Sequence, residues 1–473
     1  MAESELWRHS AHQLAALVRS RKISPVELLE SQLSAIGRFN PILNAIITLV
    51  ADRAREAAQK AEQAVMHGDE LGILHGLPIG IKDITPTAGI RTTFGSPLFA
   101  DNVPAEDAEV VRRLKSAGAI VLAKTNTPEF ATGANTVNPL FGATRNPWNP
   151  ALSPAGSSGG SAAAVACGML PLAQGTDFGC SIRIPAAFCG IVGIRSTPGL
   201  TPNYPMPLGW DPGQVHGPLA RNAEDAAMML DAIVGFSRLS PISVAPPWTN
   251  ALATVQKTRD ATGLRIAFAR DIAGIGVDSE IESICRKAAN SLRDHGAAVE
   301  EIDFDLSEGR NPYKTLRGVW MIGQQLNNLP RLEEFGDNLK QNVKSGLKIA
   351  STAIAAAEQT RLSLFQKAGA LFERYDLLLT PAAPVKPYPI EMNFPNEING
   401  KTFEDYIDWI APAFLITLIS LPAASVPAGL TADKLPVGLQ IVGPRFEEPK
   451  VLSVAKLIQQ SNPIGWPPIS NSR

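Results

Sequence analysis

GTDFGCSIRIPAAFCG, residues 175–190, places Ser181 directly after a run of small residues. The stretch lies within a longer neutral tract, 146–210, whose 65 residues carry three charges, on Asp177, Arg183 and Arg195. Small residues let backbone approach backbone, and a tight turn before Ser181 would aim several backbone N–H groups at one oxygen atom, as an oxyanion hole requires. We therefore expect the function of this chain to lie in the neutral tract.

Two further segments carry chemistry that fits this turn. GLPIGIKDI (76–84) is apolar and strand-like and ends near Lys82. Desolvation in such a strand lowers the pKa of an ammonium group, which a lysine base requires. SPAGSSGGSAAAVACG (153–168) supplies serines in flexible backbone. Together the segments predict a serine hydrolase with a lysine base and no histidine, whose relay and nucleophile are drawn from Ser157, Ser158, Ser161 and Ser181.

Other interpretations of the same residues are weaker. Gly156–Gly160 fits the GxSxG nucleophile elbow of α/β-hydrolases, but RNPWNPALSPA before it does not form the required strand. The tract lacks the GK[ST] ending of a phosphate-binding loop, and no GxGxxG follows a strand. From composition alone, the Gly, Ser and Ala residues could equally serve only close helix–strand packing.

In their order along the chain, these segments resemble the amidase signature family, the Ser–cis-Ser–Lys amide hydrolases. The resemblance rests on HGLPIGIKD (75–83), VLAKTNTPEF (121–130), GATRNPWNP (142–150), the Gly/Ser tract, GTDFGCSIRIPAAFCGIVGIRSTPG (175–199), GPLAR (217–221), DLLLTP (376–381), LPAASVP (421–427) and LPVGLQIVG (435–443). It implies that Lys82 is the base, that Ser157 on a cis peptide bond is the proton relay, and that Ser181 is the nucleophile that forms an acyl-enzyme.

The resemblance also implies roles for the neighbours of these residues. The oxyanion hole is expected from the backbone N–H groups of Phe178, Gly179, Cys180 and Ser181. Supporting roles fall to Ser158, Asp177 and Arg183. Two positions depart from the family pattern, because Ala155 and Cys180 stand where glycine is usual. The Cys180 side chain either lines the acyl pocket or packs away from it.

The substrate pocket is expected in variable loops, with Gly133, Trp210 and Gln214 as candidate residues. Gln214 stands where the family often has an acid. Trp320 and Met321 suggest an apolar pocket, and no cationic cluster suggests a clamp for a carboxylate. This favours neutral, hydrophobic amides, oligoamides, carbamates (urethanase activity) or esters as small-molecule substrates. The alternative is the glutaminase (A) subunit of a tRNA-dependent amidotransferase, which shares the signature.

Alternating helix and strand signals predict an α/β fold with a largely parallel sheet. Ser24-Pro25-Val26-Glu27 predicts a helix start, and 119–123 and 376–381 predict buried strands. A length of 473 residues corresponds to about three average domains. The resemblance implies instead one domain over 5–465, a twisted mixed sheet with helices on both faces. Its signature core is 75–235, its helical substrate-side region 240–375, and its return to the sheet 376–445.

Composition limits the remaining classes. A net charge of −2, from 43 basic and 45 acidic residues, argues against a nucleic-acid partner or an anionic membrane surface. The apolar run 409–432 is long enough to span a bilayer but is interrupted by Pro412, Pro422 and Pro427, which favours a buried helix followed by a strand. Four cysteines without a CxxC pair predict neither a disulfide framework nor a metal site. We expect a cytoplasmic monomer or homodimer without metal or cofactor.

Overall fold

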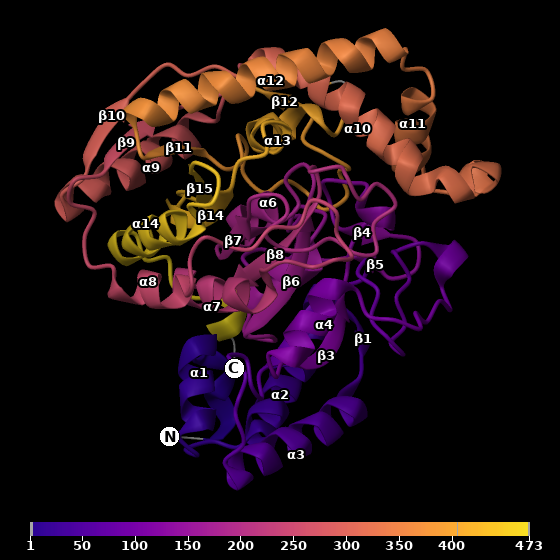
Figure 1. Ribbon diagram of the computed structural model, residues 1–473, viewed down its shortest axis with the longest axis vertical. Helices are drawn as coiled ribbons and strands as arrows, with labels where there is room; N and C mark the ends of the chain where they lie inside the picture. Colours follow the sequence, from indigo (N-terminus) through magenta and orange to yellow (C-terminus); the bar gives the residue numbers. More distant parts are fainter. Residues whose placement is uncertain (1–2, 404, 472–473) are drawn as a thin grey trace.

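Eleven strands form one sheet within residues 3–403 and 405–471, the part of the chain that the computed structural model describes (Figure 1). The strands follow the spatial order β1-β3-β2-β6-β8-β7-β14-β15-β11-β9-β10. Their bounds are β1 Ile46–Leu49, β2 Pro78–Lys82, β3 Ile120–Thr125, β6 Leu172–Asp177, β7 Val192–Arg195, β8 Val215–Ala220, β9 Arg265–Phe268, β10 Ala298–Glu301, β11 Leu377–Pro381, β14 Ala423–Leu430 and β15 Pro436–Val442. Two small ladders pair β4 (Val137–Asn138) with β5 (Gly142–Ala143) and β12 (Glu397–Ile398) with β13 (Lys401–Thr402).

The sheet is mixed, which confirms the predicted α/β fold. Strand β2 runs parallel to β3 and β6, and β9 runs parallel to β10 and β11, whereas the other neighbouring pairs in this sheet are antiparallel. Because β2 and β6 are parallel, their last residues, Lys82 and Asp177, come to the same edge of the sheet. Strand β8 starts at that edge, with His216 opposite Thr176.

Helices flank this sheet and extend beyond its ends (Figure 1). They are α1 Ala11–Arg19, α2 Pro25–Leu43, α3 Ala51–His67, α4 Glu109–Ser116, α5 Gly159–Ala166, α6 Arg183–Cys189, α7 Ala223–Ile233, α8 Ala251–Lys257, α9 Ser279–Asn290, α10 Arg310–Gln325, α11 Asp337–Gly346, α12 Ser351–Arg374, α13 Ala411–Leu418 and α14 Glu448–Ser461. In Figure 1, α1 to α3 lie at one end of the molecule and α10 to α12 at the other.

The start of α2 shows how local sequence sets an element. The Ser24 side chain accepts a hydrogen bond from the Val26 N–H, and the Glu27 carboxylate accepts one from the Ser24 N–H. Pro25 occupies the first turn, where its missing N–H has no intrahelical partner to lose. The predicted helix start is confirmed.

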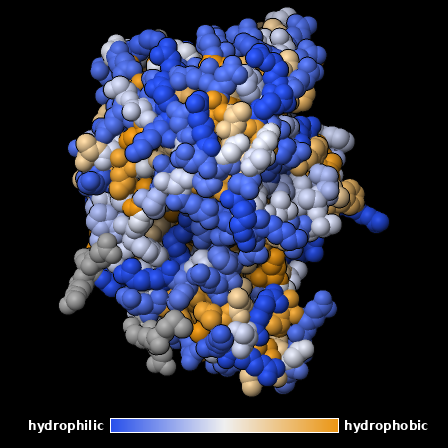
Figure 2. All heavy atoms as spheres, turned by 90° about the vertical axis from the view of Figure 1, so that its left-hand side faces the viewer, coloured by the Kyte–Doolittle hydropathy of each residue, from blue (hydrophilic) through white to orange (hydrophobic). Residues whose placement is uncertain are grey.

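The apolar run 409–432 folds as expected into a buried helix, α13, followed by the buried strand β14. Within the described residues, none of the helices has the length and apolar character needed to cross a membrane. On the face shown in Figure 2, hydrophobic residues are scattered among hydrophilic ones.

Candidate active site

Lys82 lies at the edge of the sheet with its side chain fully buried. Its Nζ is 2.6 Å from Ser157 Oγ and 2.9 Å from Thr176 Oγ1. Burial lowers the pKa of the Lys82 ammonium to about 7, although the carboxylate of Asp177 acts in the opposite direction. A substantial fraction of Lys82 is therefore a neutral amine near neutral pH.

The structure separates the four serines that the sequence left open. Ser158 Oγ donates to Thr176 O at 3.3 Å, and Ser161 Oγ donates to Gln174 O at 3.0 Å, so both hydroxyls hold strand β6. Ser157 is the serine beside the Lys82 amine. Ser181 is half-buried, whereas the other three are buried. The Ser158 N–H donates to Ser181 O at 3.1 Å and joins the Gly/Ser tract to the loop of Ser181.

The glycines of the Gly/Ser tract are required by close backbone contacts. A Cβ atom on Gly160 would lie 2.4 Å from the Asn126 backbone nitrogen, and one on Gly156 would lie 3.0 Å from Gly133 O. The peptide bond between Gly156 and Ser157 is cis. The tract therefore passes directly against the backbone of 126–135, which leaves no room for larger residues at these two positions.

Asp177 and two arginines shape the loop that carries Ser181. Arg183 donates to both carboxylate oxygens of Asp177, at 3.0 and 2.9 Å, and to Gly179 O at 2.9 Å. Arg195 donates to Asp177 O at 2.7 Å. The Asp177 carboxylate also accepts from the Ile182 N–H at 3.1 Å. Burial by itself would raise the pKa of Asp177, but the charges of the arginines hold it below its usual value.

This arrangement leaves the N–H groups of the loop without acceptors inside the protein. Within residues 3–403 and 405–471, the backbone N–H groups of Phe178, Gly179, Cys180 and Ser181 donate no hydrogen bond. Tyr313 Oη donates to Phe178 O at 3.3 Å and would lie 2.9 Å from a Cβ on Gly179. Free donors on a loop held by buried ion pairs are what a site for a developing oxyanion needs.

The two departures from the family pattern are accommodated differently. Ala155 adopts a φ of +61°, a left-handed conformation that strains any residue other than glycine. The Cys180 thiol points at the Gly156 carbonyl oxygen, 3.5 Å away, and belongs to a buried apolar cluster that also contains Ile184 and Phe188. Burial raises the pKa of the Cys180 thiol to about 12. Two orientations were expected, one lining the pocket and one packed away from it. The side chain packs against the Gly/Ser tract and is not part of the cavity wall described next, which corresponds to the second.

A cavity of about 270 Å³ lies near these residues, although Lys82, Ser157, Phe178 and Ser181 are not part of its wall. Its apolar wall contains Phe94, Phe130, Pro205, Met206, Trp320 and Met321, and its polar groups are Thr132, Asn203, Gln214, His216, Gln324 and Gln325. Its wall comes near the site at Ile84, two residues after Lys82, and at Trp320, whose ring stacks on Phe178 with centroids 4.1 Å apart. Among the described residues that line it, none is Asp, Glu, Lys or Arg.

The three candidate pocket residues lie in different surroundings. Gln214 lines the cavity. Gly133 is buried against Gly156, beside the cavity residue Thr132. Trp210 is 78% exposed and is not part of the cavity wall.

Sequence reasoning assigned no role in the site to two groups in this region. Thr176 contacts the Lys82 amine. His216, which pairs with Thr176 across β6 and β8, lines the cavity. Both stand in segments that drew attention for other reasons, Thr176 in GTDFG and His216 directly before GPLAR. Period-two alternation gives the face on which each side chain lies within its own strand. Only the knowledge that β6 and β8 pair would have brought Thr176 and His216 together.

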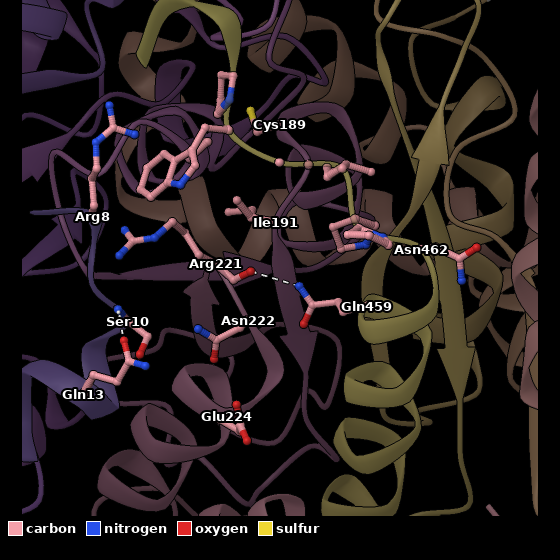
Figure 3. Close-up of a pocket in the computed structure, with 18 of the residues that line it drawn as sticks. Arg8, Ser10, Gln13, Cys189, Ile191, Arg221, Asn222, Glu224, Gln459 and Asn462 are labelled. Atoms are coloured by element: carbon pink, nitrogen blue, oxygen red, sulfur yellow. Dashed lines mark hydrogen bonds between the residues drawn. The ribbon is translucent and has the colours of Figure 1, made fainter. Parts of the chain in front are cut away.

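A second cavity, of about 510 Å³, lies between the N-terminal segment, the end of α6 with the two residues after it, and the end of α14 (Figure 3). Arg8, Arg221 and Gln459, labelled in Figure 3, line this cavity. Gln459 Nε2 donates to Arg221 O at 3.0 Å. It contains none of the lysine and serine residues discussed above. Among the described residues, no cluster of three or more His, Cys, Asp or Glu side chains could hold a metal ion.

Known proteins are similar to this chain in sequence and in architecture. The Amidase family model matches residues 27–452. An acylamidase of Rhodococcus erythropolis is 33% identical over 471 residues, covering 98% of this chain and 97% of the relative. The A subunit of the glutamyl-tRNA(Gln) amidotransferase of Sulfurihydrogenibium sp. (strain YO3AOP1) is 33% identical, covering 97% of this chain and 98% of the relative. The crystal structure of a bacterial aryl acylamidase of the amidase signature family superposes with a TM-score of 0.90 at 29% identity, covering 98% of both chains. The chain therefore belongs to the amidase signature family and is an amide-hydrolysing enzyme.

Proposed function

We propose that the protein cleaves C–N bonds of neutral, hydrophobic amides and carbamates through an acyl-enzyme on Ser181. The observation that carries the substrate class is the cavity near Lys82, whose wall includes Ile84 and His216, is mainly apolar and has no charged side chain among the described residues. A charged substrate group would lose its hydration there without gaining an ionic partner. Neutral amides lose less on entry and gain apolar contacts.

In the proposed reaction, neutral Lys82 accepts a proton through the Ser157 hydroxyl while Ser181 attacks the carbonyl carbon. The oxyanion forms hydrogen bonds with backbone N–H groups of Phe178, Gly179, Cys180 and Ser181. The relay then returns the proton to the departing nitrogen, and water hydrolyses the acyl-enzyme. Ser158, Asp177 and Arg183 hold the loops in which these groups lie.

Two contacts and the state of the Cys180 thiol support these roles. The 2.6 Å approach of Lys82 Nζ to Ser157 Oγ suits proton transfer, and the pKa of about 7 suits a base that works near neutral pH. The Ser158 hydroxyl donates to backbone, so it is a poorer nucleophile candidate than Ser181. The Cys180 thiol, with a pKa of about 12, stays protonated and inert.

The alternative function, as the glutaminase component of an amidotransferase, is favoured by the similarity to the relative from Sulfurihydrogenibium. Free glutamine carries an α-carboxylate and an α-ammonium group, and both need charged partners in a buried site. The cavity wall offers none. On α10, Arg317 is buried and donates to Tyr406 Oη at 2.5 Å and Asn342 Oδ1 at 3.3 Å, and it is not part of that wall. Neutral amides therefore fit better.

A substrate panel tests this proposal. We expect purified protein, without partner or ATP, to hydrolyse acyl anilides and aryl carbamates with kcat/KM at least roughly tenfold above that for glutamine or malonamide. A fluorophosphonate probe should label Ser181, and Ser181→Ala should abolish both labelling and turnover, while Cys180→Ser keeps both. Faster turnover of glutamine would contradict the substrate class, and a label on Ser158 or Cys180 would contradict the residue roles.

A further inference from the structure

The orientation of the Gln174 side chain is fixed by its neighbours. Its Oε1 accepts from the backbone N–H of Lys82 at 3.2 Å and from Thr85 Oγ1 at 3.1 Å. Its Nε2 donates to Gly175 O at 2.8 Å. A backbone N–H can only donate and a carbonyl oxygen can only accept, so the amide cannot be turned over.

The fixed amide decides which nitrogen of His216 carries the proton. Gln174 Nε2 lies 2.9 Å from His216 Nδ1 and has its second hydrogen available for that contact. Nδ1 must therefore accept, which places the single ring proton on Nε2. Burial, reinforced by the nearby Lys82, lowers the pKa of His216 to about 4, so the ring stays neutral at physiological pH.

The protonated nitrogen has no acceptor inside the protein. Within residues 3–403 and 405–471, His216 Nε2 makes no hydrogen bond, and the residue is 5% exposed, with Nε2 accessible rather than sealed in the core. The ring forms part of the cavity wall, in company with Gln214 and Trp320. In the β6–β8 pair it lies opposite Thr176, which contacts the Lys82 amine. His216 Nε2–H is thus a donor of fixed direction in this wall, whose other polar groups are Thr132, Asn203, Gln214, Gln324 and Gln325, and it lies on the strand that pairs with Thr176.

We propose that the Nε2–H of His216 donates a hydrogen bond to a neutral acceptor oxygen of the substrate, a carbonyl or ether oxygen within the group that fills the cavity. The inference rests on the proposed amide hydrolysis and narrows its substrate class. Purely hydrocarbon groups leave the donor unsatisfied. A buried group built to form a hydrogen bond discriminates against analogues that lack the partner.

Pairs of neutral amides that differ by one CH₂-to-oxygen replacement test the inference. The replacement is moved stepwise along the acyl chain in one series and along the leaving group in another. We expect wild-type enzyme to prefer the oxygen-containing member at one position by roughly tenfold in kcat/KM. His216→Leu should bring that ratio close to one, and His216→Gln, which keeps an N–H near the position of Nε2, should restore part of it. His295→Leu, on the surface histidine that contacts Ser461, should leave the ratio unchanged.

A second measurement uses the unaltered enzyme, so it does not depend on variants that fold. In ¹⁵N-histidine NMR, one buried histidine should show the Nε2–H tautomer from pH 5 to pH 9, and a neutral ether-containing inhibitor should shift its Nε2 resonance. The Nδ1–H tautomer, or a ratio that His216→Leu does not change, would overturn the role of His216. Failure of wild-type enzyme to hydrolyse any neutral amide or carbamate would instead overturn the proposed function, so the two failures are distinct.

Discussion

Two buried lysines on neighbouring strands show what separates a candidate base from a structural cation. Lys82 ends β2, and Lys124 lies on the adjacent parallel strand β3, opposite Ile81. Both side chains are fully buried, and burial lowers the pKa of each ammonium to about 7. Burial alone therefore does not distinguish the two.

The difference lies in the hydrogen-bonding capacity of their neighbours. Lys124 Nζ donates to Thr85 O at 2.6 Å and faces Thr87 Oγ1 at 3.0 Å and Thr92 Oγ1 at 2.9 Å. The Thr87 and Thr92 hydroxyls already donate to the carbonyl oxygens of Thr85 and Ile90. All three neighbours are thus acceptors towards Lys124, and only an ammonium group has three hydrogens to donate. This cage favours the ammonium form of Lys124 over the neutral amine.

Lys82 has neighbours of another kind. It contacts the hydroxyls of Ser157 and Thr176, and in the described part of the chain neither hydroxyl donates to another acceptor. Either can therefore donate to a neutral amine or accept from an ammonium. We infer that Lys82 can exchange a proton with Ser157 and that Lys124 cannot take such a role. The following predictions test this comparison, starting with the largest effect.

Replacing Lys82 should affect catalysis far more than stability. Lys82→Met removes the proposed base, so kcat on an anilide should fall roughly a thousandfold or more. The free energy of unfolding should fall by less than in Lys124→Met, because two hydroxyls lose a contact but no backbone carbonyl oxygen loses a donor. Single-turnover kinetics and urea unfolding measure the two effects. A variant with wild-type kcat would remove Lys82 from the reaction.

Replacing Lys124 should show the opposite pattern. Lys124→Met removes one of the two donors to Thr85 O and the ammonium donor to each of two threonine hydroxyls. We expect the free energy of unfolding to fall by about 3 kcal/mol. The variant's kcat, measured well below its unfolding transition, should stay within about tenfold of wild type, far above that of Lys82→Met. Equal losses of kcat in the two variants would contradict the distinction between Lys82 as a base and Lys124 as a structural cation.

Replacing Thr176 should change the pH dependence of the reaction. If neutral Lys82 is the base, kcat/KM rises with pH through its pKa of about 7. Thr176→Val removes an acceptor that stabilises the ammonium form, so the pKa should fall and the rising limb should move to lower pH. The plateau should fall roughly tenfold because the amine loses one of its two positioning contacts.

Thr87→Val is the matched control, since it removes the corresponding hydroxyl from the Lys124 cage. It should leave the rising limb near pH 7 and lower the free energy of unfolding by about 1 kcal/mol. Profiles of kcat/KM between pH 5 and 9, with urea unfolding of both variants, measure these effects. A limb that moves equally in Thr87→Val and Thr176→Val would contradict the distinction between the two lysines.

Much of the fold could be predicted from local chemistry. The capping box at Ser24 and the buried run 409–432 fold as the sequence indicates, because each depends on neighbours within a few residues. The pairing of the strands could not be predicted in this way. Strand β2 joins β6, although 89 residues lie between them, and β14 joins β7 across 227 residues. Contacts over such separations depend on the packing of the whole sheet.

The candidate site divides in the same way. Lys82, Ser157 and Ser181 could be selected because their segments resemble a family motif, whereas Trp210, chosen for its aromatic side chain alone, is exposed to solvent. Thr176 and His216 were not selected, since their position beside the site depends on the pairing of β6 with β8, which no local sequence pattern predicts.

By itself, the sequence determined the reactive residue types, the flexible backbone of the Gly/Ser tract and the low charge of 146–210. These are properties of composition and near neighbours. Only the tertiary structure decided which lysine contacts hydroxyls that are free to donate to it, which serine hydroxyls are already engaged and which nitrogen of His216 is protonated. The physical reason is that protonation states follow from the donors and acceptors around a group, and here distant segments supply many of them.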